Sequence, residues 1–184
     1  MRALEDRIST RIYGLERLLP SLRKHLSKAE DLWSTRAPEE LLYSPDASDA
    51  LKLFVTDLAR FQDFLGRLLW ELMRLVYQDD AITVIDALNL AARTELIELT
   101  PERWKALREA RNVFYHEYPL EDAEILQNLE FMLREAPGLI DAYCVVRDYI
   151  AEKFPHIVED AEAKLAHVRK KMQAYERPIQ GPRP

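Results

Sequence analysis

A short segment near the middle of the chain combines side chains that suit chemistry at a phosphate. Arg111, His116 and Tyr118 lie within eight consecutive residues, and Asn112 directly follows the arginine. The planar guanidinium of arginine presents several N–H donors to phosphate oxygens, and histidine gains or loses a proton near neutral pH. Together these groups are suited to breaking a phosphodiester bond.

The spacing of these residues limits how one helix can present them. Arg111 and Tyr118 are seven residues apart, so a regular helix places them on one face. His116 follows Arg111 by five residues and therefore points about 140° away from it around the helix. Either the helix unwinds before Pro119, or a second copy of the chain completes the site. A two-fold dimer would bring two such segments together across one cleft.

RNA is one phosphodiester substrate that such residues can cleave, because it carries its own nucleophile, the 2′-hydroxyl. His116 would remove the proton from that hydroxyl or protonate the leaving 5′-oxygen. Arg111 would stabilise the charge that grows on the phosphorane oxygens, and Asn112 would hold a phosphate or orient the histidine. A structural alternative exists, because arginine and histidine near a helix C-terminus also stabilise the helix dipole. The combination of all these polar residues favours catalysis.

The chain lacks the signatures of several other enzyme classes. It contains no G-x-G-x-x-G, P-loop, G-x-S-x-G or H-E-x-x-H motif. Cys144 is the single cysteine and is expected to be an inert core residue. His25, His156 and His167 are scattered along the chain and are expected to be surface or structural residues. We therefore expect neither a metal ion nor a cofactor.

Carboxylates occur on the strongly amphipathic segment that precedes the motif. Asp57, Asp63 and Glu71 are expected to lie mostly on solvated helix faces. Asp57 or Asp63 would be placed to support the site from the neighbouring helix, but the sequence does not distinguish between them.

Composition indicates a soluble helical protein. The chain has 184 residues, 48% of them apolar, with only four glycines, and is long enough for one domain with a real core. Its N-terminus lacks an apolar signal core, and no apolar run is long enough to cross a bilayer, so we expect a cytoplasmic protein without membrane contact. The net charge of −6 argues against a non-specific nucleic-acid binder but permits a local basic cleft.

Positive charge is concentrated near the C-terminus. Residues 164–184 contain six basic side chains against Glu176 alone: Lys164, Arg169, Lys170, Lys171, Arg177 and Arg183. The simpler interpretation is a solvated helix end followed by a flexible terminus. The alternative is a basic arm that touches RNA or a partner.

Apolar residues recur at helical spacing along most of the chain and predict an all-α antiparallel bundle. Helices are expected over about residues 2–33, 49–78, 81–97, 100–118, 121–153 and 155–175. Residues 34–47 are expected to form a loop, with Ser48 or Asp49 capping the next helix and Asp79-Asp80 capping the one over 81–97. Pro20 and Pro137-Gly138 should kink or break their helices. We expect one domain over residues 1–155, with its motif region at 100–119, and a C-terminal helix and flexible basic tail over 156–184.

The motif resembles one known family. Arg111-Asn112-x-x-x-His116-x-Tyr118 looks like the Arg-x4-6-His motif of HEPN domains, and in particular the Arg-x4-His-x-Tyr form of HepT toxins from the HepT/MntA toxin–antitoxin family. The resemblance covers about residues 50–152 and is specific at 111–118, whereas elsewhere it is architectural. It does not account for residues 1–45 or for those past 155.

The resemblance implies a concrete function. The chain would be a HEPN-like bundle and a metal-independent endoribonuclease, the toxin of a type VII-like toxin–antitoxin system. Arg111 and His116 would be catalytic, Asn112 supporting, and two copies would form one cleft that binds RNA. An MntA-like nucleotidyltransferase antitoxin would silence it by transferring AMP to Tyr118. The alternatives are a non-catalytic HEPN module that presents substrate to a nucleotidyltransferase, and a helical scaffold without chemistry.

Overall fold

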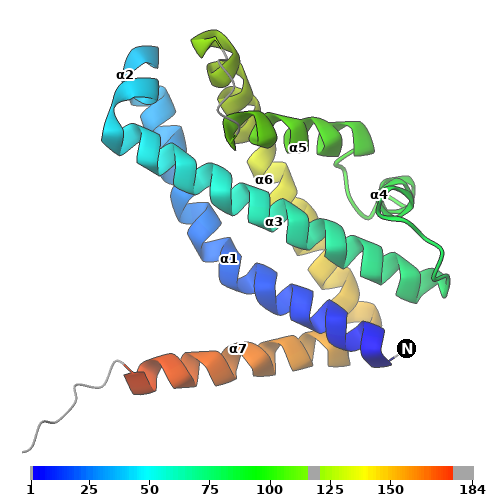
Figure 1. The fold of residues 1–184 in the computed structure, drawn as a ribbon. Helices are drawn as coiled ribbons and strands as arrows, with labels where there is room; N and C mark the ends of the chain where they lie inside the picture. Colours follow the sequence, from blue (N-terminus) through cyan, green and yellow to red (C-terminus); the bar gives the residue numbers. More distant parts are fainter. Residues whose placement is uncertain (1, 116–120, 176–184) are drawn as a thin grey trace, which may run out of the picture.

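The computed structural model describes residues 2–115 and 121–175, and every regular element in these ranges is an α-helix (Figure 1). The helices are α1 (Arg2–Thr35), α2 (Pro38–Tyr43), α3 (Pro45–Tyr77), α4 (Val84–Arg93), α5 (Pro101–Tyr115), α6 (Asp122–Lys153) and α7 (Pro155–Tyr175). The predicted all-α class is confirmed. Within these ranges, no helix combines the length and the apolar character that crossing a bilayer requires.

Three long helices form the body of the protein. α1 and α3 run in opposite directions and share the most extensive helix–helix contact, and α6 packs against both of them (Figure 1). α3 also contacts α2, α4 and α5, so it touches nearly every other element. This central place agrees with the strong three- and four-residue apolar periodicity of its sequence.

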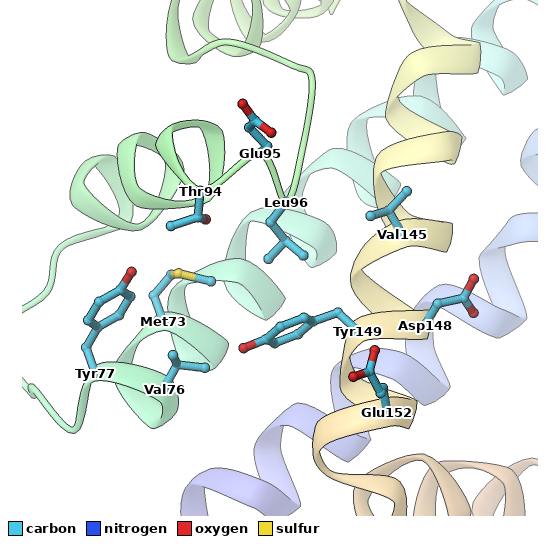
Figure 2. Close-up of a pocket in the computed structure, with 10 residues that line it drawn as sticks. All are labelled: Met73, Val76, Tyr77, Thr94, Glu95, Leu96, Val145, Asp148, Tyr149 and Glu152. Atoms are coloured by element: carbon cyan, nitrogen blue, oxygen red, sulfur yellow. The ribbon is translucent and has the colours of Figure 1, made fainter.

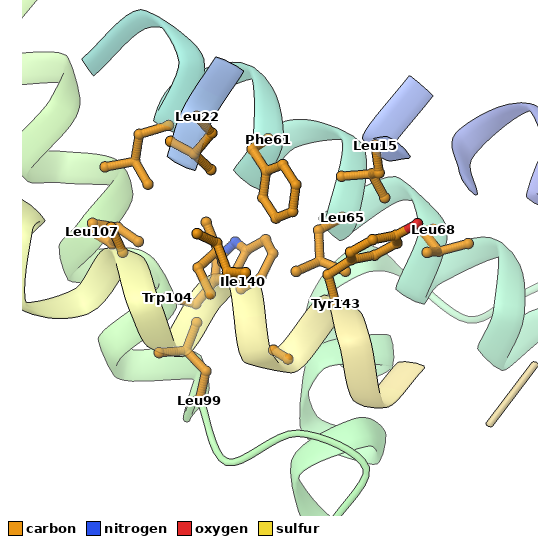
Figure 3. Close-up of a cluster of buried hydrophobic side chains, with 14 of the residues drawn as sticks. Leu15, Leu22, Phe61, Leu65, Leu68, Leu99, Trp104, Leu107, Ile140 and Tyr143 are labelled. Atoms are coloured by element: carbon orange, nitrogen blue, oxygen red, sulfur yellow. The ribbon is translucent and has the colours of Figure 1, made fainter. Parts of the chain in front are cut away.

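Large side chains from the three long helices meet in the core (Figure 3). Leu15 of α1, Phe61 and Leu65 of α3, and Tyr143 of α6 are fully buried. The rings of Phe61 and Tyr143 pack edge to face with their centroids 5.7 Å apart. The Tyr143 hydroxyl donates a hydrogen bond of 2.7 Å to the Glu16 carboxylate, and burial raises the pKa of Tyr143 well above its ordinary value.

The segment before α3 differs from the prediction. Residues 34–47 do not form a simple loop, because α2 occupies six of them and α3 already begins at Pro45. Ser44, rather than Ser48 or Asp49, stands at the N-cap position of α3. Both helices start with a proline, whose fixed φ and missing N–H are tolerated at the first helical position. The prolines that suggested a loop therefore mark two helix starts.

The two internal prolines do not divide their helices. α1 continues through Pro20, and α6 continues through Pro137 and Gly138, so neither proline breaks its helix, and the kinks predicted as the alternative stay a prediction. Residues on both sides of each proline are fully buried: Leu15 and Leu22 of α1, and Ala136 and Leu139 of α6. Packing of these flanks onto the core offsets the backbone hydrogen bond that each proline removes.

α4 is shorter than predicted and starts at a different cap. It covers Val84–Arg93 instead of residues 81–97, and Asp79-Asp80 do not cap it. Its N-cap is Thr83, which forms a capping box with Asp86: the Thr83 side chain accepts the Asp86 N–H, and the Asp86 carboxylate accepts the Thr83 N–H. After α4 the chain reaches α5 through a short non-helical segment that begins with a turn and carries Glu95 with φ of 57°.

α7 packs across the ends of α1 and α6 with its first half. Ile157, Val158 and Ala161 are buried in the common core. Asp160 accepts hydrogen bonds from Lys164 at 2.7 Å and from Ser9 of α1 at 2.6 Å, and both bonds lower the pKa of Asp160. The predicted division into residues 1–155 and 156–184 stays a prediction, and the predicted flexibility of residues 178–184 lies outside the described residues.

Replacing Phe61 by alanine should test the central role of the α1–α3–α6 core. We expect Phe61→Ala to lower the free energy of unfolding by about 3–5 kcal/mol, because it removes a buried ring and leaves a cavity. Leu53→Ala is the matched control on the same helix, since Leu53 is half exposed and its loss should cost about 0.5 kcal/mol or less. Urea unfolding measures both, and equal costs would contradict this description of the core.

Candidate functional site

α5 carries the first part of the motif, and its start is as predicted. Pro101 is the first helical residue, and the Thr100 hydroxyl accepts a hydrogen bond of 3.3 Å from the Arg103 N–H. Trp104, Leu107 and Ala110 are buried at three-residue intervals. One face of α5 therefore packs into the bundle, and the register of that face decides where the motif side chains lie.

Arg111 belongs to the buried face of α5. Only 5% of its surface is exposed. One terminal nitrogen, Nη1, donates to the Ala59 carbonyl at 2.6 Å, and the other, Nη2, donates to the Asp63 carboxylate at 2.6 Å. Nη2 and Asp63 also form an ion pair, while the buried Nε atom of Arg111 has no hydrogen-bond partner among the described residues. The guanidinium therefore fastens α5 to α3.

Two further contacts hold α5 at the same place on α3. The Gln62 side-chain amide donates a hydrogen bond of 2.8 Å to the Trp104 carbonyl. Gly66 lies directly under the indole of Trp104, and a Cβ atom built there would be 3.0 Å from the ring. Polar pairing at Gln62 and Asp63, with close approach at Gly66, thus fixes the position of α5 and of Arg111.

The structure describes only some of the remaining motif residues. Asn112 follows Arg111 and is exposed on the surface of α5. His116 and Tyr118 lie outside the described residues, as does Pro119. The predicted separation of Arg111 and His116 around the helix, and the predicted unwinding before Pro119, stay predictions.

One of the two carboxylates considered as support for the site contacts it. Asp63 is largely exposed, with 57% of its side chain accessible, and it pairs with Arg111. Asp57 faces the other way, where its carboxylate accepts a hydrogen bond of 2.5 Å from Ser21 and lies 2.8 Å from His25 Nδ1 on α1. The sequence could not show which of the two aspartates faces α5, because the helix that carries both contacts other helices on several sides.

The prediction of solvated carboxylates is wrong for Asp57 and Glu71. Both are buried in the contact between α3 and α1. Asp57 is paired as described above, and Glu71 lies 3.4 Å from the Arg11 guanidinium. Buried carboxylates require such partners, because an unpaired charge inside the protein is costly. His25 is accordingly a satisfied structural histidine.

Among the described residues, no group of three or more His, Cys, Asp or Glu side chains is arranged to hold a metal ion. Cys144 is a free cysteine of intermediate burial rather than a full core residue.

Comparison of the chain with protein-family models, with curated proteins and with solved structures finds no match.

Removing the Arg111 side chain should destabilise the protein. We expect Arg111→Ala to lower the free energy of unfolding by about 1–3 kcal/mol, because the Ala59 carbonyl loses its donor and α5 loses its anchor. Asn112→Ala is the neighbouring control, since that side chain is exposed and should contribute about 0.5 kcal/mol or less. Thermal and urea unfolding measure both, and a fully stable Arg111→Ala would show that the buried contact is dispensable.

Proposed function

We propose that the chain is a HEPN-like, metal-independent endoribonuclease of the HepT kind, the toxin of a type VII-like toxin–antitoxin pair in the cytoplasm. The Arg111-Asn112-x-x-x-His116-x-Tyr118 segment carries the proposal. The contact of Arg111 with Asp63 and the Ala59 carbonyl supports it, because it fixes the position of a phosphate-binding group. Preorganised charge of this kind is what stabilises a phosphorane.

The chemical step needs only the residues of the motif. The RNA 2′-oxygen forms a bond to phosphorus while the bond from phosphorus to the 5′-oxygen breaks. His116 takes the 2′-hydroxyl proton, and a protonated histidine supplies a proton to the leaving 5′-oxygen. The products are a 2′,3′-cyclic phosphate and a free 5′-hydroxyl. A guanidinium has five N–H donors, and those of Arg111 not used by Ala59 and Asp63 would bind the phosphate oxygens.

A homodimer fits this step better than a single chain. His116 follows Arg111 by five residues, about 140° around a regular helix, so one helix does not aim both at one phosphate. Two segments across a two-fold axis would supply two arginines and two histidines to one cleft. One histidine would then serve as the base and the other as the acid.

Control would come from a nucleotidyltransferase antitoxin similar to MntA. Transfer of AMP from ATP to the Tyr118 hydroxyl forms a tyrosyl phosphodiester and releases pyrophosphate. The added nucleotide carries bulk and negative charge into the cleft, where it would pair with Arg111 and exclude RNA phosphates.

The burial of Arg111 favours a second candidate function. A guanidinium that is only 5% exposed and already holds two partners is also what a purely structural arginine looks like. In that case the chain would be a non-catalytic HEPN module that presents substrate to a partner nucleotidyltransferase. Tests at His116 separate the two functions better than tests at Arg111, because Arg111 also stabilises the fold.

RNA cleavage by the purified chain is the first test. Wild-type protein should cleave RNA in the presence of EDTA and leave a 2′,3′-cyclic phosphate, and His116→Ala should lower the rate at least about a hundredfold. His167→Ala on the exposed surface of α7 is the control and should keep full activity. Cleavage by His116→Ala at the wild-type rate would rule out the ribonuclease, and growth arrest in cells that express only this chain should follow the same pattern.

Modification of the tyrosine is the second test. Incubation with ATP and the partner nucleotidyltransferase should add one AMP to the chain, detected by intact-mass spectrometry, and RNA cleavage should fall as the adduct accumulates. Tyr118→Phe should stay folded and unmodified, whereas Tyr115→Phe should still be modified. An adduct that persists in Tyr118→Phe would show that the tyrosine is assigned wrongly.

A further inference from the structure

A groove with an apolar floor and acidic rims runs between α6 and the segment that joins α4 to α5. Two cavities of about 460 and 340 Å³ form it, and they share Glu95, Leu96 and Val145. Met73 and Val76 of α3 complete the floor, and Figure 2 shows Tyr149 reaching toward them from α6. We call this surface the acidic groove.

The rims of the acidic groove carry carboxylates on both sides. Glu95 and Glu98 stand on the linker side, and Asp141, Asp148 and Glu152 stand on the α6 side. Within the described part of the chain, the ion-pair partners of Asp148 and Glu152 are only their sequence neighbours Arg147 and Lys153, at 4.0 and 2.6 Å. Among the described residues, Glu95, Glu98 and Asp141 form no ion pair. Such a groove fits a helix with an apolar stripe between positive flanks.

The end of α7 is a helix of that kind. Its apolar stripe is buried at Ile157 and Ala161, half-buried at Leu165 and Val168, and exposed at Met172, where 55% of the side chain is accessible. The stripe therefore continues beyond the bundle that covers its first half. We call residues 165–172 the basic arm.

Positive residues flank the exposed end of the stripe. Arg169 and Lys171 lie on its two sides at about 100° per residue. Both are exposed, and neither forms an ion pair within the described part of the chain. Lys170 points to the opposite face of the helix. The basic arm thus presents an apolar centre with a cation on each side.

The basic arm cannot fill the acidic groove of its own chain. Glu152 of the groove lies just before α7 begins, and Arg169 lies 14 residues into the helix, about 21 Å along its axis at 1.5 Å per residue. Figure 1 shows α7 running beneath the bundle and away from α4, so its C-terminal end is on the opposite side of the molecule. Only a bent or broken α7 would bring the two surfaces together within one chain.

We propose that the basic arm of one copy of this chain docks in the acidic groove of a second copy. Met172 would cover the apolar floor, Arg169 and Lys171 would meet the carboxylates on the two rims, and a reciprocal arrangement would pair both arms with both grooves. The inference goes beyond the proposed function and does not rest on it. The groove borders only the first turn of α5, through Arg103, whereas the motif lies at the other end of that helix.

Charge reversal on each surface provides the test. Arg169→Glu with Lys171→Glu reverses the arm, and Asp141→Lys with Asp148→Lys reverses the groove. All four residues are exposed, so both variants should fold. Light scattering as a function of concentration, at low ionic strength, should show larger assemblies for the wild-type chain than for either variant, whether or not a dimer also forms at the motif. Each variant alone should associate at least about tenfold more weakly, because like charges then face each other.

Mixing the two variants makes the test specific. In a pair of one arm variant and one groove variant, the arm that carries glutamates meets the groove that carries lysines, and the native arm meets the native groove. Association should therefore return to the wild-type level in the mixture alone. Lys24→Glu with Lys52→Glu is the matched control, because these exposed residues of α1 and α3 give the same change in net charge outside both the arm and the groove. A monomeric wild-type chain, unchanged association of the separate variants, or no recovery on mixing would each overturn the proposal.

Discussion

α3 is the constraint on which the rest of the structure depends. It contacts five other helices, and its polar side chains Asp57, Gln62 and Glu71 are buried. A buried polar group must find a partner, because leaving it unpaired costs a large fraction of the small net stability of a domain. Asp57 and Glu71 pair with α1, Gln62 pairs with α5, and the exposed Asp63 pairs with Arg111 of α5. Each pairing fixes the register of one neighbour, so the polar residues of α3 act as positioning contacts within an apolar core.

The consequence for the candidate site is that one side chain serves two purposes. Arg111 is the residue that the motif assigns to phosphate, and it is also the residue that holds α5 on α3. Function and stability are therefore coupled at this position, and loss of activity on changing it has two possible causes. His116 and Tyr118 belong to the same short segment and lie outside the described residues. The proposed chemistry gives each of them a role of its own, so changes at these positions test function without removing the Arg111 side chain.

The helices were predictable from the sequence where apolar periodicity is strong, and less so where prolines intervene. The bounds of α3, α6 and α7 follow the apolar spacing closely. Pro38 and Pro45 suggested a loop because proline disfavours a helix interior, yet at the first helical position it fits without cost. Pro20 and Pro137 suggested breaks, but tertiary packing on both sides outweighs one missing hydrogen bond. The apolar spacing within one helix does not show how strongly that helix will pack against its neighbours.

The candidate site shows a similar limit. The residue types and their spacing in the motif suffice to suggest phosphodiester chemistry, and they identified Asp63 as one of two possible supports. They could not show that Arg111 lies on the buried face of α5. Trp104, Leu107 and Ala110 define that face, but which face of a short helix turns inward depends on the surface that receives it. Here that surface is Ala59, Gln62, Asp63 and Gly66 of α3.

Gly66 makes the α3–α5 contact sensitive to substitution at this position. The indole of Trp104 rests on it so closely that even a methyl group would meet the ring at 3.0 Å. A larger residue there would lift the start of α5 as a rigid rod, and the rod would tilt about its other attachment, the Arg111 contact two turns further on. The orientation of the whole helix therefore depends on the absence of one side chain on its neighbour.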